Sequence, residues 1–176
     1  MSKSYCNSNY PAHLGHKLFQ QQQEGNFTDL SIETNGRIFE VHRSVLAADS
    51  EFWMAMLKGG FNEENKKSVK LANINAAVFQ TMVEYMYMGT FTVTSDSVQA
   101  LLEAADYLQC SYVKERCVEF IVENINIQSC MQIYQFADNF SLAELKEASI
   151  EFMICNFDSL PADAFTGLLF TTLYDV

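Results

Sequence analysis

The chain has 176 residues, of which 49% are hydrophobic and 19% charged, so one domain, or one domain with a helical extension, can bury a substantial core. Eleven basic and 22 acidic residues give a net charge of −11, which repels nucleic acid and anionic membranes and suits either a basic protein partner or simple solubility. No apolar run approaches the roughly 18–20 residues of a membrane span, and no signal peptide is visible, so a cytoplasmic or nuclear protein is expected.

A first helix is predicted at residues 12–24, where Leu14, Leu18 and Phe19 form a short apolar stripe and Gly25 provides a stop. Residues 1–11 are polar and lack periodicity, so this segment is expected to be flexible. The stripe by itself allows two interpretations. It either packs on the core of its own chain or needs a second copy of the protein.

A β-hairpin is predicted at residues 30–41, because apolar and polar residues alternate on both sides of Asn35-Gly36, a pair that tolerates the positive φ of a type I′ turn. Short apolar helices follow, with Asp49-Ser50 as N-cap candidates. Alternation at residues 69–71 predicts a third strand.

The rest of the chain reads as mostly helical. Asn75 is predicted to cap a helix that Gly89 ends, and residues 91–93 indicate one more short strand. Further helices are expected from about residues 95, 113 and 126, from the capping box at 141–144, and from Pro161 toward Phe170. Strands and helices mix without regular βαβ alternation, which predicts an α+β fold with a small sheet and an all-helical extension.

A search for catalytic chemistry finds no constellation that supports it. His13 and His16 lack a third metal ligand, and His42 lacks a nucleophile, so a hydrogen-bonded structural role is favoured for His42. The five cysteines form no C-x-x-C pair, and most lie at apolar helical positions, which indicates buried, reduced thiols. We therefore expect no enzyme activity, no metal and no cofactor.

Two stretches of the sequence resemble the BTB (POZ) domain. The first is Asp29 followed by Phe39-x-Val41-His42-Arg43-x-Val45-Leu46-Ala47-Ala48-x-Ser50-x-Phe52; the second includes Tyr85-x-Tyr87-x-Gly89 and Leu101-Leu102-x-Ala104-Ala105-x-Tyr107-Leu108-Gln109. Positions from Cys117 to Leu145 look like the helices that join such a domain to a BACK domain, and the closing Phe165-x-x-Leu168…Leu173 is similar to the early BACK helices. The arrangement is most similar to kelch-like proteins and divides the chain into a BTB unit at 12–123 and a 3-box with the start of a BACK domain at 124–176.

This resemblance implies homodimers. The helix at 12–24 corresponds to the dimer helix of the family, which favours self-association for Leu14, Leu18 and Phe19. Asp29 and Arg43 match the charged pair that the family places near the dimer interface.

The resemblance also implies a role as a substrate adaptor of cullin-3 RING ubiquitin ligases. Phe61-Asn62-Glu63 matches the hydrophobic-x-Glu motif of cullin-binding members, and Leu57, where the family often has Phe, borders it. Trp53 is a second departure, since Phe is usual there. Met131 and Tyr134, with Phe140, are candidates for a 3-box cleft that takes the N-terminal segment of the cullin, although burial in the helical core is favoured at least as strongly for each.

The substrate would bind a module outside these residues, such as a kelch propeller. The alternative function is a BTB scaffold that recruits a transcriptional corepressor, against which the helical run after Val113 argues.

Overall fold

The computed structural model describes residues 2–58 and 67–160. The chain divides into two compact units, Met1–Cys117 and Val118–Val176, and each is described by itself. The first unit contains a small sheet and helices, and the boundary falls inside α6. The elements are α1 (Tyr10–Gln23), β1 (Leu30–Thr34), β2 (Arg37–Val41), α2 (Arg43–Asp49), α3 (Glu51–Lys58), β3 (Ser68–Leu71), α4 (Ala76–Met88), α5 (Val98–Tyr107), α6 (Ser111–Glu123), α7 (Cys130–Asn139), α8 (Ala143–Cys155) and a 3-10 turn (Phe157–Ser159).

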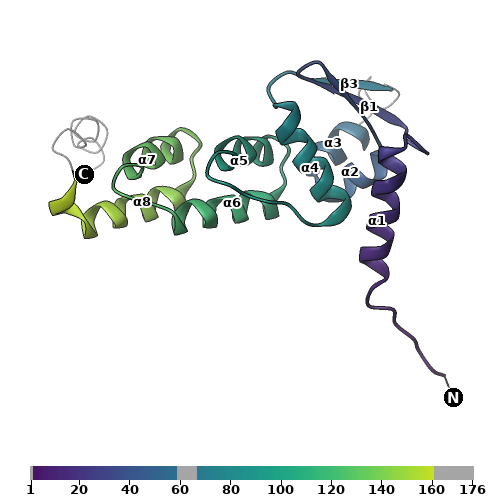
Figure 1. Ribbon diagram of the computed structural model, residues 1–176, viewed down its shortest axis with the longest axis horizontal. Coiled ribbons are helices and arrows are strands. Elements are labelled where there is room, and N and C mark those ends of the chain that lie inside the picture. The colour runs from purple at the N-terminus through teal and green to yellow at the C-terminus, as the bar shows by residue number, and fades with distance from the viewer. Residues whose placement is uncertain (1, 59–66, 161–176) are drawn as a thin grey trace. The chain divides into compact units, whose positions relative to one another are not determined.

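The sheet has the strand order β2-β1-β3, with β1 antiparallel to β2 and parallel to β3 (Figure 1). The predicted hairpin is confirmed. Asn35 and Gly36 have φ values of 47° and 77°, as a type I′ turn requires. Alternate residues of β1 are buried, including Leu30 and Ile32, so one face of the sheet contributes to the core. The buried Thr34 hydroxyl on the same strand donates to the Ile74 carbonyl.

Helix α4 supplies much of the core of the first unit. It begins where the Asn75 side chain accepts a hydrogen bond from the Ala77 N–H at 2.8 Å, and it ends at Gly89, whose φ is 68°. Both ends agree with the prediction. Phe79 is fully buried and meets Phe39 edge-on, with ring centroids 5.1 Å apart.

Helix α3 confirms the predicted N-cap. The Ser50 Oγ atom accepts from the Trp53 N–H at 3.1 Å and donates to the Leu108 carbonyl at 2.6 Å. Trp53 is fully buried, and its indole N–H has no hydrogen-bond partner in the part of the chain that the structure describes.

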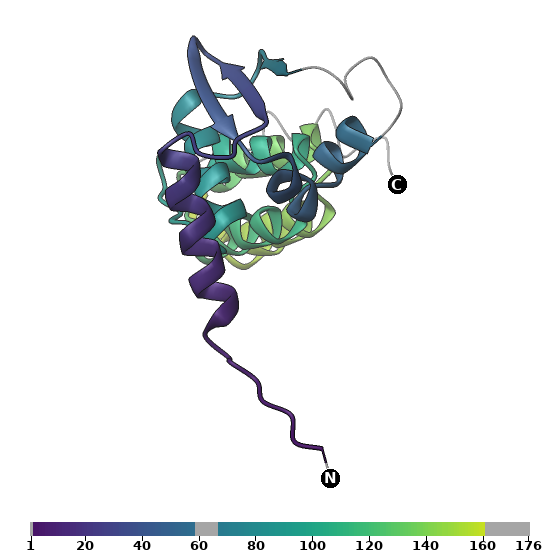
Figure 2. The same ribbon diagram turned by 90° about the vertical axis from the view of Figure 1, so that its right-hand side faces the viewer.

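Helix α1 runs beside α4 and ends near the hairpin (Figure 2). It begins at Tyr10, two residues before the predicted start. The approach to α4 is close at Gly15, where an added Cβ would lie 2.5 Å from the Tyr87 carbonyl oxygen. The Phe19 and Tyr87 rings add a contact with centroids 5.9 Å apart. Gln22 donates from its side chain to the Glu40 carbonyl at 2.8 Å and so occupies one backbone acceptor of the edge strand β2.

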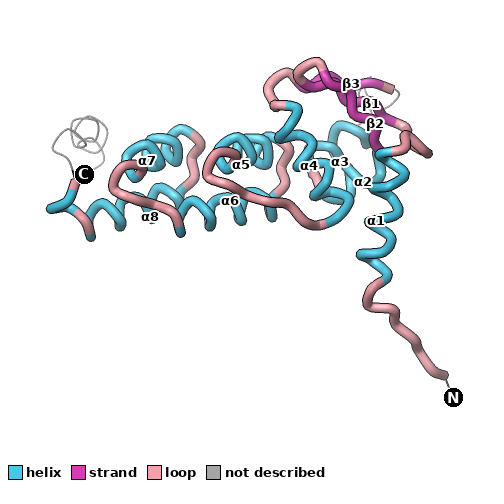
Figure 3. Tube along the Cα trace, in the orientation of Figure 1, coloured by secondary structure: helices cyan, strands magenta, loops and turns pink. Residues whose placement is uncertain are grey.

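In the second unit, α7 and α8 pack side by side (Figure 3). Their buried cluster consists of Cys130, Tyr134, Met153 and Leu160, with Met131 among the partly buried residues packed against it. This pair confirms the helices expected after residues 126 and 141. The last predicted helix, from Pro161 toward Phe170, lies outside the described residues.

Two local predictions were wrong. Residues 90–94 form no strand: the sheet of the described residues, β2-β1-β3, does not include them, and the Phe91 ring packs against Tyr85 and Tyr112 instead. The capping box at 141–144 does not form either. Ser141 has a φ of 53° and ends α7, with the Leu142 N–H bonded to the Ala137 carbonyl at 2.8 Å, so its hydroxyl does not cap α8.

Candidate functional site

One face of α1 presents apolar side chains to solvent. Tyr10 and Leu14 are 56% and 42% exposed, and they lie four residues apart on the same side of the helix. Leu18 continues this row and is half-buried, as is Phe19, which turns toward α4. All residues of α1 are described, and none of them is buried. The helix is therefore held along one side while an apolar row remains uncovered.

Asp29 and Arg43 are in contact with each other. The Arg43 N–H donates to Asp29 Oδ1 at 2.8 Å, and the Arg43 Nε–H donates to the Asp29 carbonyl at 3.2 Å. Since Arg43 is the first residue of α2, the Asp29 carboxylate accepts from an N–H group at the start of that helix. This contact fixes the loop before β1 against α2.

His42 has the structural role that the sequence predicts. Its Nε2 lies 3.0 Å from the Asn26 carbonyl and so must donate there, which leaves Nδ1 to accept from the Tyr87 hydroxyl at 2.7 Å. The same hydroxyl accepts from the His42 backbone N–H at 2.9 Å. Burial raises the pKa of Tyr87 to about 12, with a smaller contribution from the charge of Asp29, while the His42 hydrogen bond opposes the shift.

The predicted cullin-docking residues divide between described and undescribed segments. Leu57 lies in the last turn of α3 and is half-buried. Phe61 and Glu63 lie outside the described residues. In the second unit, Tyr134 is only 4% exposed and belongs to the buried cluster, and Met131 packs against that cluster. Phe140 is 38% exposed and packs on Phe136 with ring centroids 4.6 Å apart. Of these three 3-box candidates, Phe140 has the most exposed side chain.

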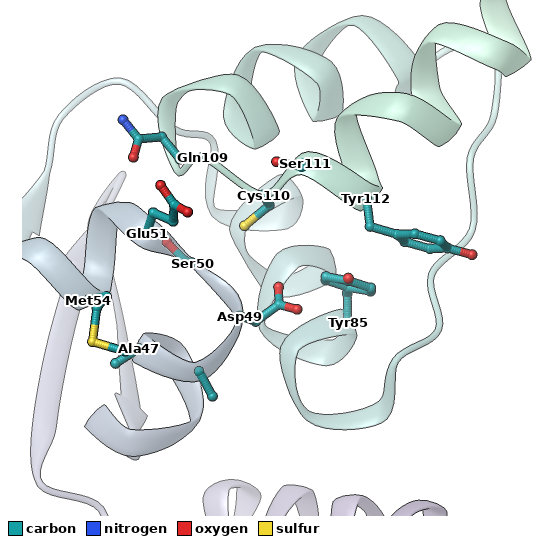
Figure 4. A pocket seen from close by; sticks show the side chains of 11 residues that line it. Ala47, Asp49, Ser50, Glu51, Met54, Tyr85, Gln109, Cys110, Ser111 and Tyr112 are labelled. Atoms are coloured by element: carbon teal, nitrogen blue, oxygen red, sulfur yellow. The ribbon is translucent and has the colours of Figure 1, made fainter.

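The first unit also contains a cavity of about 440 Å³ that the sequence does not reveal (Figure 4). It is bordered by the end of α2, the start of α3, α4 and the turn into α6. Asp49, Tyr85 and Cys110 are among the residues that line it. Asp49, Tyr85 and Cys110 are far apart in the chain, so no spacing pattern brings them together. Only the fold does.

Burial shifts the titration of the groups in this cavity. It raises the pKa of the Asp49 carboxyl above its usual range, although the hydrogen bonds from Tyr85 and Cys110 oppose the shift. Burial also raises the pKa of Tyr85 and brings that of Cys110 to about 12, and in both cases the charge of Asp49 adds to the effect. A thiol with so high a pKa is a poor nucleophile at neutral pH.

Within the described ranges, no group of three or more His, Cys, Asp or Glu side chains is arranged to hold a metal ion. Cys110, Cys117 and Cys130 are buried free thiols, as predicted for most of the cysteines, whereas Cys6 and Cys155 are exposed. None of the described helices combines the length and the apolar character that crossing a membrane requires.

The first unit is a small α+β module with an exposed apolar row on α1. The model of the BTB/POZ domain family matches residues 18–125, and the chain belongs to this family. It is 33% identical over 171 residues to Kelch repeat and BTB domain-containing protein 2 of Pongo abelii, covering 97% of this chain and 27% of the relative. Kelch-like protein 23 of Mus musculus is 36% identical over 135 residues, covering 76% of this chain and 24% of the relative.

A comparison with solved structures also finds a BTB domain. The BTB domain of zebrafish PATZ1 matches with a TM-score of 0.64 and 27% identity, covering 70% of this chain and all of that domain. The chain spans about a quarter of the length of the curated relatives named above. The comparisons therefore support a BTB-based adaptor or scaffold.

Proposed function

We propose that this chain is the dimeric, cullin-binding part of a substrate adaptor for a cullin-3 RING ubiquitin ligase, acting in the cytoplasm or nucleus. Its role is to bind and position other proteins without catalysis. The observation that carries the proposal is membership of the BTB/POZ family with a Phe61-x-Glu63 motif directly after α3. We assign substrate binding to a kelch-type module beyond the residues of this chain.

Self-association is supported by the uncovered row on α1. Tyr10 and Leu14 expose large apolar surfaces, and burying such side chains stabilises an interface by about 25 cal/mol per Å² of apolar area before the costs of association. The close contact of Gly15 with Tyr87 holds the helix so that this row faces away from α4. A second copy of α1 is the partner that we propose for it.

Cullin docking is supported by the position of the motif. Helix α3 ends at Lys58, and the half-buried Leu57 in its last turn precedes the motif closely in the sequence. An aromatic anchor fills a pocket on a partner, and a carboxylate accepts hydrogen bonds from the partner's N–H groups. Phe61 and Glu63 are the residues to which we assign these roles. Leu57 and the 3-box residues Met131 and Tyr134 would shape the adjoining surface.

Calorimetric titration of the chain with the N-terminal domain of cullin-3 tests the proposal. We expect binding that Phe61→Ala weakens by about 2 kcal/mol or more, as for other buried aromatic anchors. Phe61→Leu, which keeps an apolar group, should lose less. Phe27→Ala is the matched control, since it removes a ring that is 82% exposed and lies outside the motif. Absence of binding by the unaltered chain would refute cullin docking.

The helices after residue 125 favour the adaptor over a corepressor scaffold. The family match ends there, yet α7 and α8 continue as a packed pair with their own buried cluster. We assign this pair to the 3-box and the beginning of a BACK domain. A scaffold that ends with the BTB unit has no need of it.

A further inference from the structure

Strand β2 is an edge of the sheet. In the described residues the strand order is β2-β1-β3, so β2 pairs with a neighbour on one side only. The alternation of backbone groups along β1 decides which groups of β2 remain on the other side. The Ser31 N–H donates to the Lys67 carbonyl at 2.9 Å, toward β3, so the alternate residues Leu30, Ile32 and Thr34 carry the hydrogen bonds to β2.

The backbone groups of Ile38 and Glu40 point away from β1. Residues 37, 39 and 41 pair with the three residues of β1 that bond to β2, and Ile38 and Glu40 alternate with them. The Gln22 side chain of α1 confirms this direction, because it reaches the Glu40 carbonyl from outside the sheet at 2.8 Å. Its amide stands where the N–H of a further strand would stand. Among the described residues, no other partner takes the N–H and C=O of Ile38 or the N–H of Glu40.

A hollow of about 550 Å³ lies beside this edge. It is lined by β2, by the end of α1 and by Gln80 of α4, all of which belong to the first unit. The volume lies within the range of roughly 300–1,000 Å³ that is typical of binding sites. Ile38 lines the hollow and is 64% exposed, although it is a large apolar residue. An extended segment of a few residues therefore has room to lie along β2 and to cover Ile38.

The charges beside the edge indicate which segment fits. Glu24 and Glu40 line the hollow, and in the described part of the chain their carboxylates are hydrogen-bonded to uncharged side chains. The basic lining residue, Arg37, lies on the other face of β2, where its guanidinium donates to Gln80 Oε1 at 3.0 Å. The outer face thus offers an apolar side chain at Ile38 and a carboxylate at Glu40. A strand with an apolar residue and a Lys or Arg two positions apart complements both.

We propose that the free edge of β2 binds an extended segment of a protein partner, which joins the sheet as an antiparallel strand. An apolar side chain of the segment lies opposite Ile38, and a Lys or Arg two residues earlier in the segment lies opposite Glu40. Antiparallel pairing is the more stable arrangement, and its three bonds, to the N–H and C=O of Ile38 and the N–H of Glu40, leave the Gln22 contact intact.

This edge is a different surface from those of the proposed function. The apolar row at Tyr10 and Leu14 lies in the first half of α1, whereas the hollow meets the last turn of that helix at Gln22 and Gln23. The segment that holds Phe61 and Glu63 does not contribute to the lining. Binding at the β2 edge therefore does not depend on cullin docking.

The test is an NMR titration of the isotope-labelled 176-residue chain with the blocked pentapeptide Thr-Lys-Thr-Val-Thr and two control peptides. The first control carries an N-methyl group on Val, which removes the N–H meant for the Ile38 carbonyl, and the second has Glu in place of Lys. We expect the Lys peptide to shift the amide signals of residues 37–41, the N-methyl peptide to bind about tenfold more weakly, and the Glu peptide to lose a smaller factor. No shift at residues 37–41, or equal binding of the N-methyl peptide, would overturn the proposal.

Glu40→Lys reverses the charge at the edge, and we expect it to reverse the preference, so that the Glu peptide binds more tightly than the Lys peptide. Asp96→Lys is the matched control, since it makes the same change in net charge at an exposed carboxylate outside the hollow, and it should keep the preference for Lys. A reversed preference in both variants would show a general effect of net charge and refute the site. If Glu40→Lys alters the folded spectrum, Ile38→Thr, which keeps a β-branched residue at an exposed position, should weaken binding of the Lys peptide.

Amide hydrogen exchange gives an independent readout. The Phe39 N–H faces β1 and should exchange slowly in the chain without peptide, whereas the Ile38 N–H faces outward and should exchange fast. Saturation with the Lys peptide should slow exchange at Ile38 and leave Phe39 unchanged, because only the outer edge gains a partner. An Ile38 amide that is already protected in the chain without peptide would show that the edge is covered and would contradict the proposal.

Discussion

Helices α4 and α1 lie side by side but use their apolar residues differently. Five residues of α4 are buried, among them Phe79 and Tyr87, whereas none in α1 is. Helix α4 places its apolar surface in the core of its own unit, and α1 keeps an apolar row at Tyr10 and Leu14 in contact with water. Two helices of similar length thus differ in how much of their apolar surface the unit itself covers, and the uncovered part of α1 is the surface that we propose for association.

The largest loss of stability is expected from a substitution in α4. Phe79→Ala should lower the free energy of unfolding by about 3–5 kcal/mol, because it leaves a cavity at a fully buried position against Phe39. Urea denaturation at a fixed protein concentration measures it. Phe27→Ala, at an 82% exposed position, is the control and should change stability by no more than about 0.5 kcal/mol. A similar loss in both variants would remove the contrast between buried and exposed rings.

An intermediate loss of stability is expected where α1 and α4 touch. Gly15→Ala places a methyl group 2.5 Å from the Tyr87 carbonyl oxygen, so α1 must shift, and we expect a loss of about 1–3 kcal/mol. Helix propensity alone would instead favour alanine by about 1 kcal/mol, so the sign of the change is informative. Thermal denaturation followed by circular dichroism measures it, with exposed Lys17→Ala as the control. A stabilised Gly15→Ala variant would show that the contact is not close in solution.

The smallest effect on folding, and the largest on association, is expected at Leu14. Leu14→Glu changes a 42% exposed residue, so the helical content should remain, but a charge in the middle of the proposed interface should convert dimers to monomers. Sedimentation equilibrium measures the mass. His13→Glu adds the same residue one position away, about 100° around the helix, and should leave the dimer intact. Unchanged dimers in Leu14→Glu would remove α1 from the interface.

The local structure that was predictable from sequence depended on residues with one strong conformational preference. Asn35-Gly36 and the Asn75 to Gly89 helix were both predicted because their turn and caps need only neighbouring residues. The wrong predictions concern residues for which two local structures compete. Ser141 serves the end of α7 rather than the start of α8. Residues 91–93 alternate as a strand does, but they do not join the sheet of the described residues, and Phe91 packs on Tyr85 and Tyr112.

The functional surfaces likewise divide into features that the sequence predicts and features that depend on the tertiary fold. Leu14 was singled out by its apolar spacing, and Asp29 and Arg43 by the family resemblance. The structure places Leu14 on α1 and Arg43 at the start of α2, and the part of all three in a dimer stays a prediction. The cavity bordered by α2, α3, α4 and the turn into α6 was not predicted, because it depends on segments that only the tertiary fold brings together. Tyr134, a candidate for a partner surface, lies in a buried cluster, and periodicity cannot distinguish a core position from a covered interface.

The hydroxyl of Tyr87 has a consequence for the order of folding. It bonds to both the backbone and the ring of His42, 45 residues earlier, and the same ring reaches the Asn26 carbonyl after α1. Closing a loop of that length costs entropy that no local contact recovers, so these bonds form only once the hairpin and α4 have come together. The bond from the His42 ring to the Asn26 carbonyl therefore ties the segment that follows α1 to a contact that needs both the hairpin and α4 in place.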